Sequence, residues 1–323
     1  MTGGNDEFSE PKSWFALPHS PAERNAAILW IVTTIVAVVV AGILGFNLVG
    51  NFISFPPWVF LPLLVTIPII LYMMAQSKRD TPKFTRRTTS VVILWYLSTA
   101  IIWPTIGFDL SSIYLAITLF GLGFVGPLLY LRYSQGFSIS ELGFTRGTRR
   151  NVIVSIIITA LYGVLVFVQF GYWEWLGFTS LVDLMPGSDP LVLVPIAFLF
   201  GGAFAMIAAA LPEELVFRGV LQSYFAERNG RLMGLLIASL IFGLFHILVN
   251  TFLYQSFYGS AITPLVFMSA LAHTFLLQAQ GGLIFGLAWE RTRSMLLPVM
   301  LHTIHNAVEL LPFYVGVMLG IFI

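Results

Sequence analysis

Long apolar runs alternate with short polar segments along almost the whole chain. A bilayer core needs about 20 apolar residues per helix. This rule predicts membrane spans near residues 26–47, 58–76, 88–107, 111–131, 152–172, 190–216, 232–250, 264–289 and 295–322. The pattern predicts eight or nine helices, with a break of the last one at Pro312 as the alternative. We therefore expect an all-α, polytopic transmembrane helical bundle.

The polar segments differ in charge, and the difference predicts an orientation. Lys and Arg gather in SKRDTPKFTRR, in RYSQGFSISELGFTRGTRR and in the turns at 228–231 and 291–293. The alternate segment YWEWLGFTSLVDLMPGSDP carries three acidic residues and no basic one. Because basic loops stay in the cytoplasm, these four segments and the N-terminus are predicted to be cytoplasmic.

The first 25 residues mix acidic residues, Pro and Gly, with no basic region before the first apolar run. They therefore do not resemble a cleaved signal peptide. We predict a polar cytoplasmic tail at 1–25, accessory transmembrane helices at 26–188 and a transmembrane core that carries the polar groups at 189–323. No inverted repeat of the transporter kind is visible.

Composition supports the membrane assignment and narrows the function. The chain of 323 residues is 58% hydrophobic and only 10% charged, outside the usual range of soluble domains. Its net charge of +1 offers no basic field for nucleic acid, so nucleic acid is excluded as a partner and the lipid bilayer is the expected surroundings. Cysteine is absent, so any metal ion would need His, Asp or Glu ligands.

Ionisable side chains inside apolar runs are costly and by default mark function. Here they gather in the last third of the chain: Glu213, Glu214, Arg218, His246, His273, His302, His305 and Glu309, with Asn306 beside them. Glu214 and Arg218 are four residues apart and can pair on one helix face. Glu213 is rotated by about 100° from Glu214. One glutamate can therefore be held while its neighbour stays free to act as a general base.

Helix geometry places two of these groups at one depth. If Asn229 and Gly230 form a turn, Glu213 and His246 both lie about 22 Å from it at 1.5 Å per residue, so they can meet across the hairpin. Phe242 lies one turn below His246 on the same face. On the last helix His302 lies only about 13 Å above its basic end, so its depth matches less well.

Each group also has a purely structural interpretation. Glu214 and Arg218 can form an ion pair in a dry environment, and the histidines and Asn306 can be interhelical hydrogen-bond partners. We expect His305 and Glu309 to pair with each other. Phe242 and His273 keep a packing role as their favoured interpretation. The convergence of three polar sets in three nearby spans nevertheless favours a functional site.

Three ordered patterns carry a resemblance to a known family: EExxxR at Glu213, Glu214 and Arg218, FxxxH at Phe242 and His246, and HxxxN at His302 and Asn306. Together they resemble the CAAX protease and bacteriocin-processing family (CPBP or Abi), the family of the Ras-converting prenyl-protein endopeptidase. The resemblance covers roughly residues 190–312. It implies that Glu213 with His246 activates a water, that His302 and Asn306 stabilise the oxyanion, and that Arg218 pairs with Glu214 to orient the motif.

The family has been described both as metalloproteases and as metal-free glutamate proteases. A zinc ion would take Glu213, His246 and His302 as ligands. Asn is a poor zinc ligand and the chain has no HExxH motif, so the sequence favours a mechanism without a cofactor.

The resemblance implies an integral membrane endopeptidase, expected in the cell membrane of a prokaryote. It would hydrolyse a peptide bond of membrane-associated proteins or peptides, among them prenylated CAAX-type substrates. Two alternatives from other classes stay open. One is a non-catalytic membrane scaffold or bacteriocin self-immunity protein with the same fold. The other is a proton-coupled transporter, because Glu and His relays in membranes often carry protons.

Overall fold

The structure is a computed structural model that describes residues 21–48, 82–105, 119–145, 148–183, 189–248, 250–251 and 263–318. All regular structure in these ranges is helical, which confirms the expected all-α class. The predicted span at 58–76 and most of the N-terminal tail lie outside the described residues. The predicted total of eight or nine spans therefore stays a prediction.

The N-terminal half supplies helices and π-helical segments, the latter labelled η. Their bounds are α1 Pro21–Leu48, α3 Arg86–Thr105, η2 Leu119–Val125, α5 Gly126–Leu129, η3 Tyr130–Ser134 and α6 Arg149–Asp183. Helix α6 differs from the expectation, because it continues through much of the acidic segment predicted to be a loop. The first proline after the apolar run is Pro186, so nothing in the backbone ends the helix earlier.

One long helical stretch carries the EExxxR motif. It runs through α7 Pro190–Ala205, η4 Met206–Ala210, α8 Leu211–Glu213, η5 Glu214–Gln222 and α9 Ser223–Asn229. The side chain of Asp189 caps its start by accepting a hydrogen bond from the Leu191 amide at 2.9 Å. Pro212 cannot donate to the preceding turn, and the stretch is π-helical on both sides of α8.

The predicted turn after this stretch is confirmed. Gly230 ends α9 with φ 91° and ψ 157°, a conformation that a residue with a side chain rarely adopts, and α10 Arg231–Phe245 begins directly after it. The remaining elements are α12 Pro264–His273, η6 Thr274–Ala279, α13 Gln280–Thr292, α14 Leu296–Glu309 and α15 Leu311–Met318. The last predicted span is thus two helices with a break at Leu310, shortly before Pro312.

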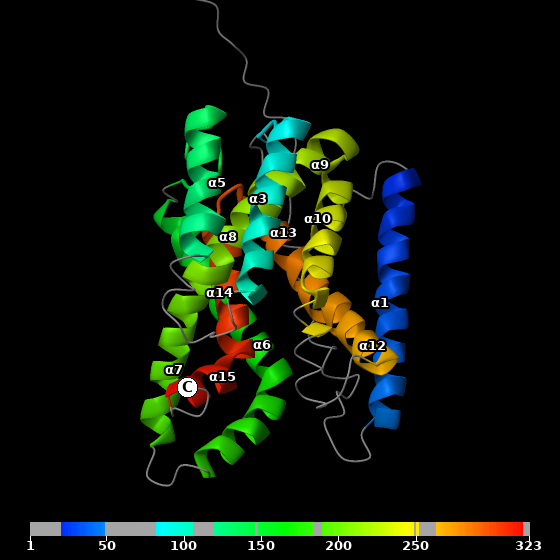
Figure 1. Cartoon of the computed structure of the whole chain (residues 1–323), viewed down its shortest axis with the longest axis vertical. Helices are drawn as coiled ribbons and strands as arrows, with labels where there is room; N and C mark the ends of the chain where they lie inside the picture. Colours follow the sequence, from blue (N-terminus) through cyan, green and yellow to red (C-terminus); the bar gives the residue numbers. More distant parts are fainter. Residues whose placement is uncertain are drawn as a thin grey trace, which may run out of the picture.

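The helices pack as a bundle around α14 and η5. Helix α14 contacts α6, α7 and α13, while η5 contacts α3, α10 and α13. Helix α1 lies at one edge beside α12 (Figure 1). Two helical stretches, Arg149–Phe167 and Leu191–Asn229, are long and apolar enough to cross a membrane. Leu161 and Leu199 on these stretches are 63% and 71% exposed, as expected for surfaces that contact lipid.

Candidate active site

The residues of the three motifs meet in the interior of the bundle. Glu213 is the last residue of α8, η5 carries Glu214 and Arg218, α10 carries Phe242 and is capped by His246, and α14 carries His302 and Asn306. Four of these side chains are almost completely buried: Glu214 is 0% exposed, Arg218 1%, His302 2% and Glu213 7%. Groups of this polarity remain buried only when they satisfy one another.

Glu214 joins two of the motifs. Its Oε2 lies 3.2 Å from Nε of Arg218, and its Oε1 lies 2.7 Å from Nδ1 of His302. An ionised carboxylate only accepts hydrogen bonds, so Nδ1 of His302 carries the proton of this bond. The pairing of Glu214 with Arg218 that their spacing predicted is present as an ion pair between residues four apart. The bond to His302 was not predicted, because no spacing rule connects positions 88 residues apart.

Arg218 is held from three sides. Its Nη2 donates to the carbonyl oxygen of Gly282 at 3.1 Å, and its guanidinium lies 4.4 Å from the centre of the Phe242 ring. The Phe285 ring lies 5.4 Å from the same guanidinium and stacks on His302 with ring centres 4.8 Å apart. The sequence did not indicate Gly282 and Phe285 as members of the site, because α13 carries none of the three patterns.

Glu213 is the acid that stays free of the ion pair. Its Oε2 is buried and has no hydrogen-bond partner among the described residues. The same oxygen lies 3.8 Å from Nε2 of His246 and 3.8 Å from Nε2 of His302. These distances are too long for direct hydrogen bonds and suit a bridging water.

The tautomer of His246 follows from its backbone contact. Nδ1 lies 2.8 Å from the carbonyl oxygen of Phe242. A carbonyl can only accept, so Nδ1 is the donor, and in the neutral ring Nε2 keeps its lone pair. The side chain of His246 is 18% exposed and is the most accessible of the charged or titratable motif residues. The acceptor atoms of His246 and Glu213 therefore face each other at the open side of the cluster.

The expected depth mismatch of His302 does not occur. The predicted depth of His302 was counted from Arg293 as a marker of the membrane surface. Arg293 is only 4% exposed, however, and its Nη2 lies 2.6 Å from Oε2 of Glu290. Arg293, which directly follows α13, is therefore buried in the protein and does not mark the membrane surface, whereas Arg291 in the last turn of α13 is exposed.

Two further polar groups of α14, His305 and Glu309, lie apart from this cluster. His305 accepts or donates a hydrogen bond with the Tyr162 hydroxyl at 2.9 Å and lies 3.4 Å from Glu309, the partner expected from the sequence. Asn306 follows His302 by one turn and is half-buried. The side chain of His273 lies outside the described residues.

Glu213, His246 and His302 are the side chains of this cluster that the sequence analysis named as ligands for a metal ion. Within the described residues, no group of three or more His, Asp and Glu side chains has the arrangement needed to hold one. Nδ1 of His302 is engaged by Glu214 and Nδ1 of His246 by a carbonyl, so each ring has only Nε2 to offer. A histidine that binds zinc needs only one ring nitrogen and usually donates a hydrogen bond from the other. The mechanism without a cofactor therefore stays a prediction.

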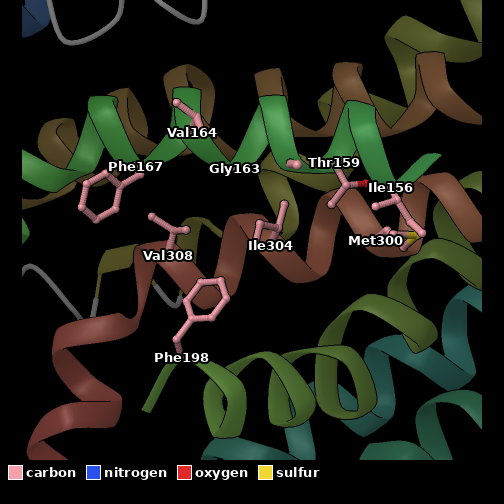
Figure 2. A pocket seen from close by; sticks show the side chains of 10 residues that line it. Ile156, Thr159, Gly163, Val164, Phe167, Phe198, Met300, Ile304 and Val308 are labelled. Atoms are coloured by element: carbon pink, nitrogen blue, oxygen red, sulfur yellow. The ribbon is translucent and has the colours of Figure 1, made fainter. Parts of the chain in front are cut away.

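An apolar groove lies on another face of α14, away from the motif residues. It has a volume of about 460 Å³ and is lined by residues of α6, α7 and α14, among them Gly163, Phe198 and Ile304 (Figure 2). The lining contains a single hydroxyl, that of Thr159, and no titratable group. The groove therefore offers no chemistry of its own.

Fold and site together define a class of protein: an all-helical membrane chain that encloses a buried cluster of Glu, Arg and His. Residues 195–308 match a family described as type II CAAX prenyl endopeptidase Rce1-like. This range contains every residue of the three motifs, so the family resemblance inferred from them is confirmed. No curated protein and no solved structure matches the chain.

Proposed function

We propose that this protein is a multi-pass intramembrane endopeptidase that cleaves membrane-associated proteins or peptides with a water activated by Glu213 and His246. The observation that carries the proposal is the unpartnered Oε2 of Glu213, which lies 3.8 Å from the Nε2 atoms of both His246 and His302. A water at this point donates one hydrogen to Glu213 and one to His246. Its lone pair is then free to attack a carbonyl carbon.

The bond changes of the reaction follow from this position. As the water oxygen bonds to the carbonyl carbon, Glu213 takes its proton, and the carbonyl oxygen becomes an oxyanion. When the tetrahedral intermediate collapses, the C–N bond breaks and Glu213 returns the proton to the leaving amine. The products are a carboxylic acid and an amine, and Glu213 is again ionised. The carboxylic acid then gives its remaining proton to the amine or to water and becomes a carboxylate.

Oxyanion stabilisation falls to His302 and Asn306 in this proposal. The Asn306 amide is a neutral donor one helical turn from His302. His302 donates from Nε2 when the ring is doubly protonated, and Glu214 then supplies the counter-charge through Nδ1 at 2.7 Å. Arg218 holds Glu214 in place from the opposite side.

The substrate class rests on the family match over 195–308. The test uses the full chain in liposomes with two fluorogenic peptides of one sequence, one with a prenylated cysteine four residues from its end and one without. We expect cleavage of the prenylated peptide, and loss of a general base typically lowers the rate by a factor of about 10² to 10⁴. Glu213→Gln and His246→Gln should both show such a loss.

The matched control is Glu309→Gln, because this acid lies on α14 but pairs with His305 outside the cluster. It should keep the wild-type rate. If the wild type cleaves neither peptide, or if Glu213→Gln cleaves at the full rate, the protease mechanism is wrong. Proton flux across the same liposomes in the absence of cleavage would favour the transporter instead.

A further inference from the structure

We infer that Asn250 and Thr274 are positioning residues for His246: their hydrogen bond holds the chain next to this histidine on η6. The ring thereby keeps its direction toward Glu213. Neither residue of the pair belongs to the three motifs. Asn250 follows His246 by four residues, and Thr274 is the first residue of η6. The effect on the rate rests on the proposed function, whereas the effect on the histidine ring does not.

The regular backbone bonding of α10 stops at His246. The helix ends at Phe245, and the amide of His246 donates to the carbonyl oxygen of Gly243, three residues before it, at 2.8 Å. The chain then continues as a helix in which the Asn250 amide donates to the carbonyl oxygen of His246 at 2.9 Å. A bond across three residues tightens the last turn of a helix. His246 therefore lies at a joint between two helical pieces, and the direction of its side chain depends on how both are held.

The piece before the joint is held by a close approach of two backbones. A Cβ atom added to Gly243 would lie 2.8 Å from Cβ and 3.2 Å from Cα of Ala279, the last residue of η6. Small residues at such a point allow two helices to pack closely. Helix α10 also contacts α13, which continues η6, and the two helices lie side by side in Figure 1. The end of α10 therefore packs directly on η6.

The piece after the joint is held by a side-chain hydrogen bond. Nδ2 of Asn250 donates to Oγ1 of Thr274 at 2.9 Å. Asn250 is 3% exposed and Thr274 2%, so bulk water has little access to this bond. Thr274 and Ala279 are the two ends of one short segment. Segment η6 therefore contacts the chain on both sides of His246.

The ring of His246 needs this support because its contact with the catalytic acid is long. Nδ1 lies 2.8 Å from the carbonyl oxygen of Phe242, and Nε2 lies 3.8 Å from Oε2 of Glu213. A displacement of about 1 Å at such a site can lower the rate by a factor of about 10². Asn250 and Thr274 are buried away from any substrate. Loss of their bond should therefore lower kcat and leave KM unchanged.

The test is Thr274→Val in the full chain in liposomes, because valine has the shape of threonine and lacks the hydroxyl. We expect kcat with the prenylated peptide to fall by a factor of about 10 to 100 at an unchanged KM. Thr274→Ser keeps the hydroxyl and should retain a kcat within a factor of about two of wild type. A single interhelical hydrogen bond contributes little to the stability of a membrane protein, so the melting temperature should stay the same.

The matched control is Thr251→Val. Thr251 directly follows Asn250 and is 6% exposed, but its hydroxyl donates within its own helix, to the carbonyl oxygen of Ile247 at 2.6 Å. This variant should keep the wild-type rate. Asn250→Leu removes the interhelical bond from its other end and gives the same reading if Thr274→Val does not fold. The double variant Asn250→Leu, Thr274→Val should lose no more activity than Asn250→Leu alone, and losses that multiply would overturn the pairing.

NMR of the histidine rings separates this inference from the proposed function. In micelles of protein with isotope-labelled histidine, the ring nitrogen signals that are missing from His246→Gln belong to His246. Thr274→Val should shift these signals, and Thr251→Val should not. Shifted signals in a protein that cleaves no peptide support the positioning and refute the protease. Unshifted signals, or a kcat of Thr274→Val within a factor of about two of wild type in an active enzyme, overturn the role of the pair.

Discussion

Replacement of Arg218 by Met tests whether the buried ion pair organises the site. Met preserves most of the volume and removes the charge, which leaves Glu214 at 0% exposure without its cation. Breaking a buried pair in this way destabilises a protein by about 3–5 kcal/mol. The lost bond to the Gly282 carbonyl, about 1.5–3 kcal/mol alone, belongs to the same group and does not add fully. We expect a total loss of about 4 kcal/mol.

The assay is reversible unfolding in mixed detergent micelles, followed by tryptophan fluorescence. The matched control is Arg228→Met, because Arg228 pairs with Glu227 at 3.5 Å while its side chain is 41% exposed. Exposed pairs contribute about 0–1 kcal/mol. The double variant Glu214→Gln, Arg218→Met removes the stranded charge and should recover part of the loss. A loss below about 1 kcal/mol for Arg218→Met, or a double variant less stable than the single one, would refute the reasoning.

Four further outcomes are expected. Gly201→Ala should destabilise the protein by about 1–3 kcal/mol, because the new methyl group would overlap the Tyr314 ring. Gly202→Ala, whose nearest neighbour is 3.8 Å away, should leave the melting temperature in detergent unchanged. Gly143→Ala combines φ 86° with an overlap of Trp289 and should lose at least about 2 kcal/mol in the same assay. A chelator such as 1,10-phenanthroline should leave peptide cleavage unchanged, and inhibition that zinc reverses would contradict the metal-free proposal.

The helical class and the hairpin at Gly230 could be predicted because each depends on a short, continuous stretch of the sequence. Apolar runs about as long as a bilayer is thick identify helices without knowledge of their neighbours. The pair Asn229 and Gly230, which lies between Arg228 and Arg231, marks a turn for the same reason. The end of α6 could not be predicted in this way. The acidic residues suggested a loop there, but a helix ends where its backbone hydrogen bonds can no longer form. No proline lies between the start of α6 and Pro186.

The candidate site was predictable as a set of residues and only partly as a geometry. Spacing within a helix correctly places Arg218 beside Glu214. Spacing carries no information on contacts between helices, so the bond from His302 to Glu214 was not foreseen. The charge pattern also misjudged the depth of His302, since a buried Arg293 is indistinguishable from an exposed one in the sequence.

The helices before residue 188 carry none of the three motifs, but two of them contact helices that do. Helix α3 contacts η5, and α6 contacts α14. Tyr162 of α6 bonds His305, and Gly163 beside it leaves room for Ile304, so α6 holds α14 at the level of His302. His305 follows His302 by three residues on one rigid helix, so a contact that restrains the rotation of α14 also restrains Nε2 of His302. Helix α6, which lies outside the family match, therefore restrains the helix that carries His302. The geometry of the site therefore depends on a helix that carries none of the motifs, and variants of Tyr162 in α6 should alter the rate before they alter substrate binding.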